Sequence, residues 1–391
     1  MGYLSSHQKP PLWRDERFLQ ALSQVVFLLL VLVGIGVLIN NMINGLSRQG
    51  MTLGFGFFTQ VSGFDVSETP IPYSRSSAYW EAFVVGLLNT LRVSFFGIIL
   101  ATLLGVVIGV ARLSSNVLIS GLAKVYVEIF RNLSLLVFLV FWYAGIFLKL
   151  PRVKDAIVVW DAVLLTNRGI GIPWGIPTET FRPFVYSLIG GAVLAVALAL
   201  VLIWRGKQTG RMPLVWFWAF LVWLAVAVVS WWVLPDPLEW DFPYVKGLNL
   251  AGGRIFSPEF MALLSGLVVY TSAFIAEVVR AGILSVPKGQ WEAARALGLS
   301  GFQSLRMVIF PQALRLIVPP LTSQYLNLTK NSSLAVAIGY PDLFYVSNTI
   351  INQSGRAVEM ISLVMLVYLT FSLLTSLFMN WYNEKIRLVE R

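Results

Sequence analysis

Residues 291–298 read Trp-Glu-Ala-Ala-Arg-Ala-Leu-Gly, and Phe310-Pro311 follow shortly downstream. The pattern predicts about two turns of a polar helix, ended where Gly298 adopts the left-handed conformation common at helix ends. Long apolar runs lie on both sides of this stretch. A membrane protein has little reason to place a structured amphipathic element there unless a soluble partner docks on it. The stretch therefore predicts a membrane protein with a docking loop.

The residues around this helix predict its shape. Glu292 is expected in the first helical turn, where the helix dipole favours a carboxylate. The small pair Ala293–Ala294 would allow close approach to a groove on a partner. Either Ser300 or Ser304 begins the next helix, because serine is a preferred N-cap. Pro311 is expected to end that helix or to kink it.

Composition excludes several classes of protein. Hydrophobic residues make up 57% of the chain and charged residues 12%, whereas a soluble domain carries about 25% charged residues. The chain has no cysteine and one histidine, His7, which excludes disulfides, thiolate metal sites and histidine catalysis. No acidic cluster suggests a metal site, and no catalytic residue is expected. Basic residues beside apolar spans account for the net charge of +10, so no nucleic-acid partner is expected.

Apolar segments long enough to cross a bilayer, which takes about 20 residues, predict an all-α polytopic membrane protein. Eight segments qualify: 22–44, 83–111, 121–148, 184–204, 214–234, 259–281, 314–340 and 357–381. The first is too long for the apolar core of a signal peptide and is expected to be retained. The seventh contains Pro319, Pro320 and Lys330, so it is expected to be broken or to line a protein interior.

Basic residues orient the spans, since cytoplasmic segments are enriched in lysine and arginine. Their distribution puts both termini and the loop 284–313 in the cytoplasm. The outer segments 45–82, 149–183 and 235–258 are rich in Pro, Gly, Trp and Tyr, and are expected to be compact loops rather than domains. Gly105 and Gly109 form a small-residue face that predicts close helix packing.

Further motifs carry a family resemblance. They read Gly-Leu-Leu-Asn-Thr-Leu at 86–91, Tyr-Val-Glu-Ile-Phe-Arg-Asn at 126–132, Phe-Ile-Ala-Glu-Val-Val-Arg-Ala-Gly-Ile at 274–283, Asn-Leu-Thr-Lys-Asn-Ser-Ser-Leu at 327–334 and Asn-Trp-Tyr-Asn at 380–383. With the loop pattern E-A-A-x3-G, the chain resembles ABC importer permeases of the histidine/glutamine-type polar amino acid family. The length, the extra spans at 184–234 and Asn167-Arg168-Gly169 fit the longer form, typified by general L-amino acid and cyanobacterial neutral amino acid permeases.

The resemblance implies a type I importer permease and a division of the chain. Its parts are a cytoplasmic tail at 1–21, a first helix and outer loop at 22–82, permease core at 83–148, outer loops with an inserted hairpin at 149–258, permease core with the coupling loop at 259–385, and a tail at 386–391. Ser134 stands where the family has proline, Phe138 where many members have glutamine, and Phe310 where leucine precedes Pro311. The change at Phe138 is expected to alter substrate choice or this subunit's share of the substrate path.

The resemblance also implies partners. These are an ABC ATPase dimer reached through residues 292–311, a periplasmic amino acid binding protein, membrane lipid, and a second permease, in a heterodimer rather than a homodimer. The chain lacks the pattern G-x4-G-K-[ST], so ATP and magnesium are expected on the ATPase and no cofactor on this chain. The expected location is a bacterial inner membrane.

Two sets of candidate residues follow. ATPase coupling is assigned to Glu292, Ala293, Ala294, Gly298 and Pro311. The substrate path or its gate is assigned to Asn89, Thr90, Glu128, Arg131, Asn132, Glu277, Arg280, Asn327, Lys330, Asn331 and Ser332.

Each member of the second set has an alternative role. Glu128–Arg131 and Glu277–Arg280 have helical spacing that permits ion pairs, which serve either structure or gating. The amides and hydroxyls serve either substrate contact or hydrogen bonding between helices.

A self-contained secondary transporter or channel is the alternative function. Discontinuous helices and internal repeats are typical of such proteins. The seventh span is compatible with that class, but no internal repeat is evident and the docking loop would have no role.

Overall fold

The computed structural model describes residues 16–48, 53–209 and 214–386. Within these residues, six helices are long and apolar enough to cross a membrane: α1 (Glu16–Arg48), α2 (Tyr79–Ala111), α5 (Phe181–Thr209), α6 (Val215–Val233), α7 (Pro258–Leu284) and α12 (Ala357–Ile386). Two bent helix pairs bring the number of possible spans to eight. Each of the eight predicted segments coincides with one of these helices or pairs, so the expected polytopic helical fold is confirmed.

The third predicted span is not one straight helix. α3 (Val117–Asn132) and the helical run from α4 (Leu135–Val140) to Lys149 meet at an angle of 107°. The chain turns because Leu133 and Ser134 both have extended backbone, with ψ of 145° and 125°. The segment 121–148, expected as a single span, is therefore a sharply bent helix pair.

The seventh span is broken as predicted, but after the prolines. Pro319 and Pro320 lie inside α10 (Phe310–Asn331), and the chain then tightens into the 3-10 helix η7 (Ser332–Ile338). Gly339 turns the chain with a positive φ of 77°, and Asp342 caps a further helix, α11 (Leu343–Ser354). This short helix was not predicted, because its twelve residues fall below the length of a span.

The main core lies where α2 crosses α7. A Cβ added to Gly105 would lie 2.6 Å from the Ile275 side chain, and one added to Gly109 would lie 2.7 Å from the Ala276 carbonyl oxygen. The predicted small-residue packing face is thus confirmed. Side chains of α4 and α10 complete this core, and a second core joins the start of α2 to α11 and α12.

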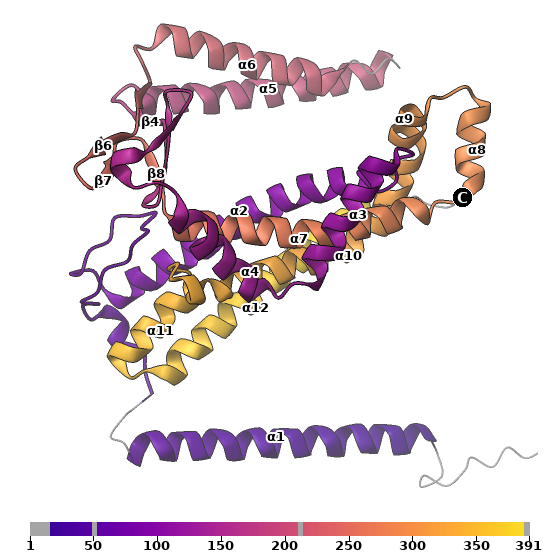
Figure 1. Ribbon diagram of the computed structural model, residues 1–391. Coiled ribbons are helices and arrows are strands. Elements are labelled where there is room, and N and C mark those ends of the chain that lie inside the picture. Colours follow the sequence, from indigo (N-terminus) through magenta and orange to yellow (C-terminus); the bar gives the residue numbers. More distant parts are fainter. Residues whose placement is uncertain (1–15, 49–52, 210–213, 387–391) are drawn as a thin grey trace, which may run out of the picture.

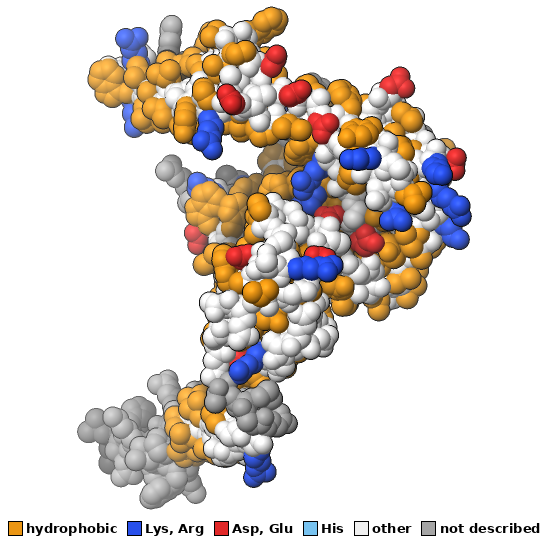
Figure 2. Space-filling model, turned by 90° about the vertical axis from the view of Figure 1, so that its left-hand side faces the viewer, with side chains coloured by type: hydrophobic (Ala, Val, Ile, Leu, Met, Phe, Trp, Pro, Cys, Tyr) orange, Lys and Arg blue, Asp and Glu red, His pale blue; other side chains and the backbone are white. Residues whose placement is uncertain are grey.

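Strands cover one end of the molecule, where compact loops were expected (Figure 1). β1 (Ile157–Val159), β2 (Val163–Thr166), β3 (Gly169–Ile172) and β8 (Arg254–Phe256) form an antiparallel sheet in that order. β4 (Trp174–Pro177) pairs with β5 (Leu238–Asp241), and β6 (Tyr244–Lys246) pairs with β7 (Asn249–Ala251). The segments before and after the inserted hairpin therefore pair with each other through short strands, which the expectation of compact loops did not include. Charged side chains of both signs are exposed at this end (Figure 2).

Three helices lie apart from the core (Figure 1). The α5–α6 hairpin packs on itself through Ala195, Ala199, Val215 and Ala219, and none of the apolar window of α1 is buried. α8 (Lys288–Ala296) and α9 (Gly301–Ser304) lie at the end opposite the strands. α1 begins and α12 ends at this same end.

Candidate coupling surface and transport path

The polar helix forms as the sequence predicts, with one correction. α8 runs from Lys288 to Ala296. Gly298 has φ of 74°, and its N–H donates to the Arg295 carbonyl at 2.9 Å. Because α8 begins at Lys288, Glu292 lies in its second turn rather than in its first. The helix dipole therefore supports Glu292 less than expected.

The next helix starts at Ser300, which excludes Ser304 as its cap. Ser300 and Gln303 form a reciprocal capping box, with Ser300 N–H donating to the Gln303 side chain at 2.9 Å. A π-helical turn, η6 (Leu305–Ile309), then leads into α10. Pro311 lies in the first turn of α10, where its missing N–H costs little. The helix does not end at Pro311, because α10 continues to Asn331; the regular helix is instead disturbed in the π-helical turn just before the proline.

The two alanines of the loop have different surroundings. Ala294 is 2% exposed, while Ala293 and Glu292 are exposed. Ala294 faces inward because α8 packs against α9 and η6. Ala294 is therefore not available to a partner, whereas Glu292, Ala293, Arg295 and Ala296 around it are exposed.

Apolar side chains beside α8 complete an exposed surface. Leu297, Phe302 and Met307 are 80%, 71% and 65% exposed. Gln312 donates to the Gln290 side chain at 3.2 Å, which ties α8 to α10. Exposed apolar side chains on a rigid polar element are typical of an interaction site.

An ion-pair cluster holds the α8 end of α7. Arg280 Nη2 lies 2.6 Å from Glu277 Oε1, which confirms the pairing predicted from their spacing. Arg112, just after α2, also binds Glu277. Arg112 was missed because a partner on another helix leaves no local spacing signal. The cluster joins α2 to α7 and supports a structural role for Glu277 and Arg280.

Glu128 and Arg131 do not pair. Glu128 instead lies 3.8 Å from Lys124, and both side chains are about 60% exposed. The Arg131 guanidinium lies 5.5 Å from the centre of the Phe274 ring. Asn132 donates to the Glu128 carbonyl at 2.6 Å and is exposed. The pairing prediction was wrong because helical spacing permits a pair without selecting it over other partners.

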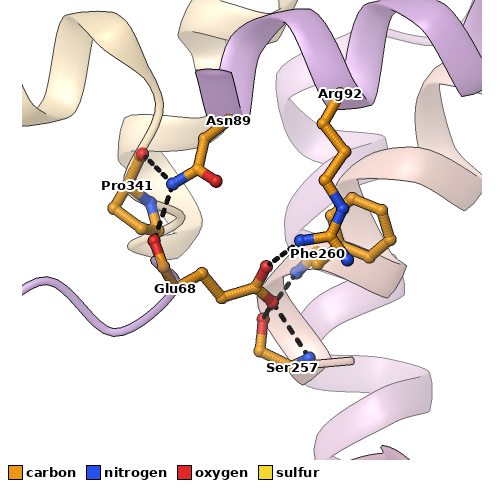
Figure 3. A network of polar contacts seen from close by, with 6 residues as sticks. All are labelled: Glu68, Asn89, Arg92, Ser257, Phe260 and Pro341. Atoms are coloured by element: carbon orange, nitrogen blue, oxygen red, sulfur yellow. Dashed lines mark hydrogen bonds and ion pairs between the residues drawn. The ribbon is translucent and has the colours of Figure 1, made fainter. Parts of the chain in front are cut away.

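Asn89 and Thr90 connect helices. Both are fully buried. Asn89 Nδ2 donates to the carbonyls of Glu68 and Pro341, each at 2.9 Å, and Thr90 Oγ1 accepts from the Leu343 N–H at 2.9 Å. These bonds attach α2 to the start of α11 and the turn before it, and Figure 3 shows the two bonds of Asn89. Their partners support the structural reading of these two residues.

Glu68 is the centre of an unpredicted polar network at the strand end (Figure 3). Its carboxylate lies 2.9 Å from Arg92 Nη1 and accepts from the N–H of Ser257, the cap of α7, at 3.1 Å. The Arg92 guanidinium lies 4.2 Å from the centre of the Phe260 ring. One carboxylate thus joins the outer loop, α2 and α7. Glu68 precedes α2 in an irregular segment, so its sequence carried no signal of this role.

The polar candidates at the end of α10 and the start of η7 have different surroundings. Asn327 and Lys330 are exposed, Asn331 is half-buried and Ser332 is buried. Ser332 Oγ donates to the Thr329 carbonyl at 2.8 Å. An exposed lysine and amide on a membrane helix do not face lipid, because such groups are costly in hydrocarbon. This face of α10 therefore turns toward water or another protein.

The path candidates do not converge on one pocket. Asn89 and Thr90 contact the turn before α11, Glu277 and Arg280 lie near the α8 end of α7, and the open face of α10 carries Asn327 and Lys330. Phe138 is 6% exposed and packs against Phe130 and Trp142 at ring distances of 5.2 and 6.0 Å. Phe138 is part of an aromatic cluster rather than of an open surface.

Membrane helices joined by an exposed helical loop fit a transporter permease, and comparison with known proteins identifies the family. Residues 211–388 match the model of the binding-protein-dependent transport system inner membrane component family. The chain is 44% identical to a putative amino-acid ABC transporter permease, YhdX, of Escherichia coli, over 95% of this chain and 94% of that protein. It is 43% identical to the general L-amino acid permease AapQ of Rhizobium johnstonii, over 96% and 94%.

Among solved structures, an amino acid ABC transporter crystallised with histidines covers 78% of this chain and 95% of that one, with 22% identity and a TM-score of 0.47. The relatives in sequence show that this chain belongs to the family of ABC amino-acid permeases. It is a multi-pass membrane subunit and a transport component, not an enzyme. Transporters of this family include a separate ATPase and a substrate-binding protein.

Proposed function

We propose that this chain carries amino acids inward as half of a type I importer, and that an ATPase drives it through α8. The observation that carries the proposal is the exposed surface of Glu292, Ala293 and Leu297 on α8 and its glycine turn. The contact between Gln290 and Gln312 ties α8 to α10. Movement of α8 would therefore move the helix that carries Asn327 and Lys330.

The proposed orientation of the chain in the membrane follows from the exposed surface on α8 and its glycine turn. An ATPase that works on ATP must reach α8 from the cytoplasm of a bacterial inner membrane. α1 begins and α12 ends at the α8 end (Figure 1), which supports a cytoplasmic location for both termini. The strands at the opposite end then face the periplasm and the amino acid binding protein. ATP and magnesium bind the ATPase dimer, and this chain needs no cofactor.

The open face of α10 supports a second permease as partner. In a two-fold homodimer, equivalent residues lie symmetrically about the interface. A homodimer formed around α10 would bring two Lys330 cations together, and like charges at an interface are unfavourable. A different permease subunit avoids this repulsion, and lipid covers α1 and the hairpin. Asn327 and Lys330 then face the substrate path between the two subunits.

Replacement of Gly298 tests the coupling assignment. Gly298→Ala places a side chain at φ of 74°, a conformation that costs about 1 kcal/mol for residues other than glycine. We expect substrate-stimulated ATP hydrolysis by the reconstituted transporter to fall severalfold, because α8 loses its orientation. Gly289→Ala is the control, since Gly289 lies in α8 with open space around it.

Equal activity of both variants would count against the coupling assignment. Uptake by this chain alone, without ATP, would instead favour the alternative of a secondary transporter or channel.

A further inference from the structure

A pocket of about 750 Å³ lies behind the coupling helix, between α8 and the ends of α2 and α7. Lys288, Trp291 and Arg295 form its α8 side. These residues are three and four positions apart, so they share one face of the helix. The pocket therefore has two cations and an indole along one wall.

The opposite wall is apolar with a polar edge. Leu284, Leu305 and Ile119 contribute apolar surface, and Ser114 and Ser115 contribute hydroxyls from the turn between α2 and α3. Beyond Ile119, Leu118 and Leu122 are 70% and 65% exposed on α3. An apolar track thus leads from the pocket along a membrane-facing helix.

The pocket lies at a membrane surface. α2 ends at Ala111 and α7 at Leu284, so both spans end at the pocket wall. Tryptophan and basic residues are enriched at this boundary between hydrocarbon and water. The pocket is therefore expected at the level of the lipid headgroups.

The two cations have no acidic partner among the residues that the structure describes. Neither Lys288 nor Arg295 forms an ion pair there, although Arg112 and Arg280 nearby share Glu277. Two unpaired cations beside apolar surface fit an external anion that also has an apolar part. Basic pockets between membrane helices on the cytoplasmic side bind anionic headgroups for this reason.

We propose that this pocket binds an anionic phospholipid. Lys288 and Arg295 contact the phosphate, the serine hydroxyls donate to its oxygens, and acyl chains lie along Ile119 and α3. A zwitterionic lipid would gain less, because its own ammonium group opposes the cations. The bound lipid would hold α8 in place from the membrane side. That effect on transport rests on the proposed coupling role of α8, whereas the binding of the lipid does not.

Lipid-specific quenching tests the binding in the assembled transporter. The chain has no cysteine, so Ile119→Cys can carry a fluorophore in a transporter whose partner chains have been made cysteine-free. Nanodiscs of phosphatidylcholine would contain increasing fractions of either spin-labelled phosphatidylglycerol or spin-labelled phosphatidylcholine. We expect phosphatidylglycerol to quench at the lower fraction.

Charge-removing variants identify the residues that bind. Each basic residue near an anionic membrane surface contributes about 1 kcal/mol, or roughly a fivefold preference, so Lys288→Gln with Arg295→Gln should weaken the preference about 25-fold. Arg306→Gln is the control, because Arg306 is exposed nearby but lies outside the pocket lining. It should leave the preference unchanged.

Three results would overturn the proposal. Equal quenching by both lipids would mean that the pocket does not select anions. No quenching by either would mean that a protein partner fills it. An equal loss in the control would assign the effect to general surface charge. Because quenching needs no ATP hydrolysis, the binding can fail or succeed independently of the coupling role.

Discussion

Single residues show where spacing predicts an interaction and where it does not. Glu277–Arg280 and Glu128–Arg131 have the same spacing, yet only the first pair forms. The difference arises because Glu277 lies where α2 meets α7, whereas Glu128 is largely exposed and has Lys124 one turn away. The sequence could predict Gly298 at a helix end, since glycine tolerates a positive φ. It could not reveal Glu68 or Arg112, whose partners are brought together only by the fold.

The two glutamates provide a prediction at this scale. Glu277→Gln should lower the stability of the chain by about 1–3 kcal/mol, because Arg112 and Arg280 lose their charged partner in a partly buried site. Glu128→Gln should change it by less than about 0.5 kcal/mol, since exposed ion pairs contribute little. Thermal unfolding of the detergent-solubilised transporter measures both. Similar losses in the two variants would show that the Glu277 cluster adds little to stability.

The secondary-structure elements follow the apolar pattern of the sequence wherever an apolar run is long enough to cross a membrane. Each long apolar run became a membrane helix or part of a bent helix pair, but α11 and the strands were not predicted. α11 is too short to register as a span, and the strands have three or four residues each. The pairing of β4 with β5 joins segments on either side of the α5–α6 hairpin. Such pairing depends on how that hairpin folds back, which composition does not specify.

The crossing of α2 and α7 provides a prediction at this scale. Gly109→Ala should destabilise the chain by about 1–3 kcal/mol, since overpacking forces backbone shifts and its Cβ would meet the Ala276 carbonyl at 2.7 Å. Gly121→Ala should be neutral or stabilising, because Gly121 lies in α3 with open space around it and alanine favours helix. The unfolding temperatures of the two variants make the comparison. A neutral Gly109→Ala would mean that the two helices are not tightly packed there.

The whole molecule is incomplete as a single chain. α1 and the hairpin bury little apolar surface against the core, and α10 exposes a lysine and an amide. These surfaces are consistent with a subunit of a larger membrane assembly, as membership of the family requires. The docking loop in the sequence already predicted such an assembly. The sequence could not show which residues of that loop are exposed. The structure separates Ala293, which is exposed, from Ala294, which is 2% exposed.

That separation gives the most direct test of the central claim, that an ATPase docks on the outer face of α8. Ala293→Cys and Ala294→Cys would be introduced singly into the cysteine-free chain of the assembled transporter, and each would be treated with a short thiol-to-amine cross-linker. The account predicts a covalent link to the ATPase from position 293 and far less from position 294. No link from position 293, with the transporter intact and active, would contradict it.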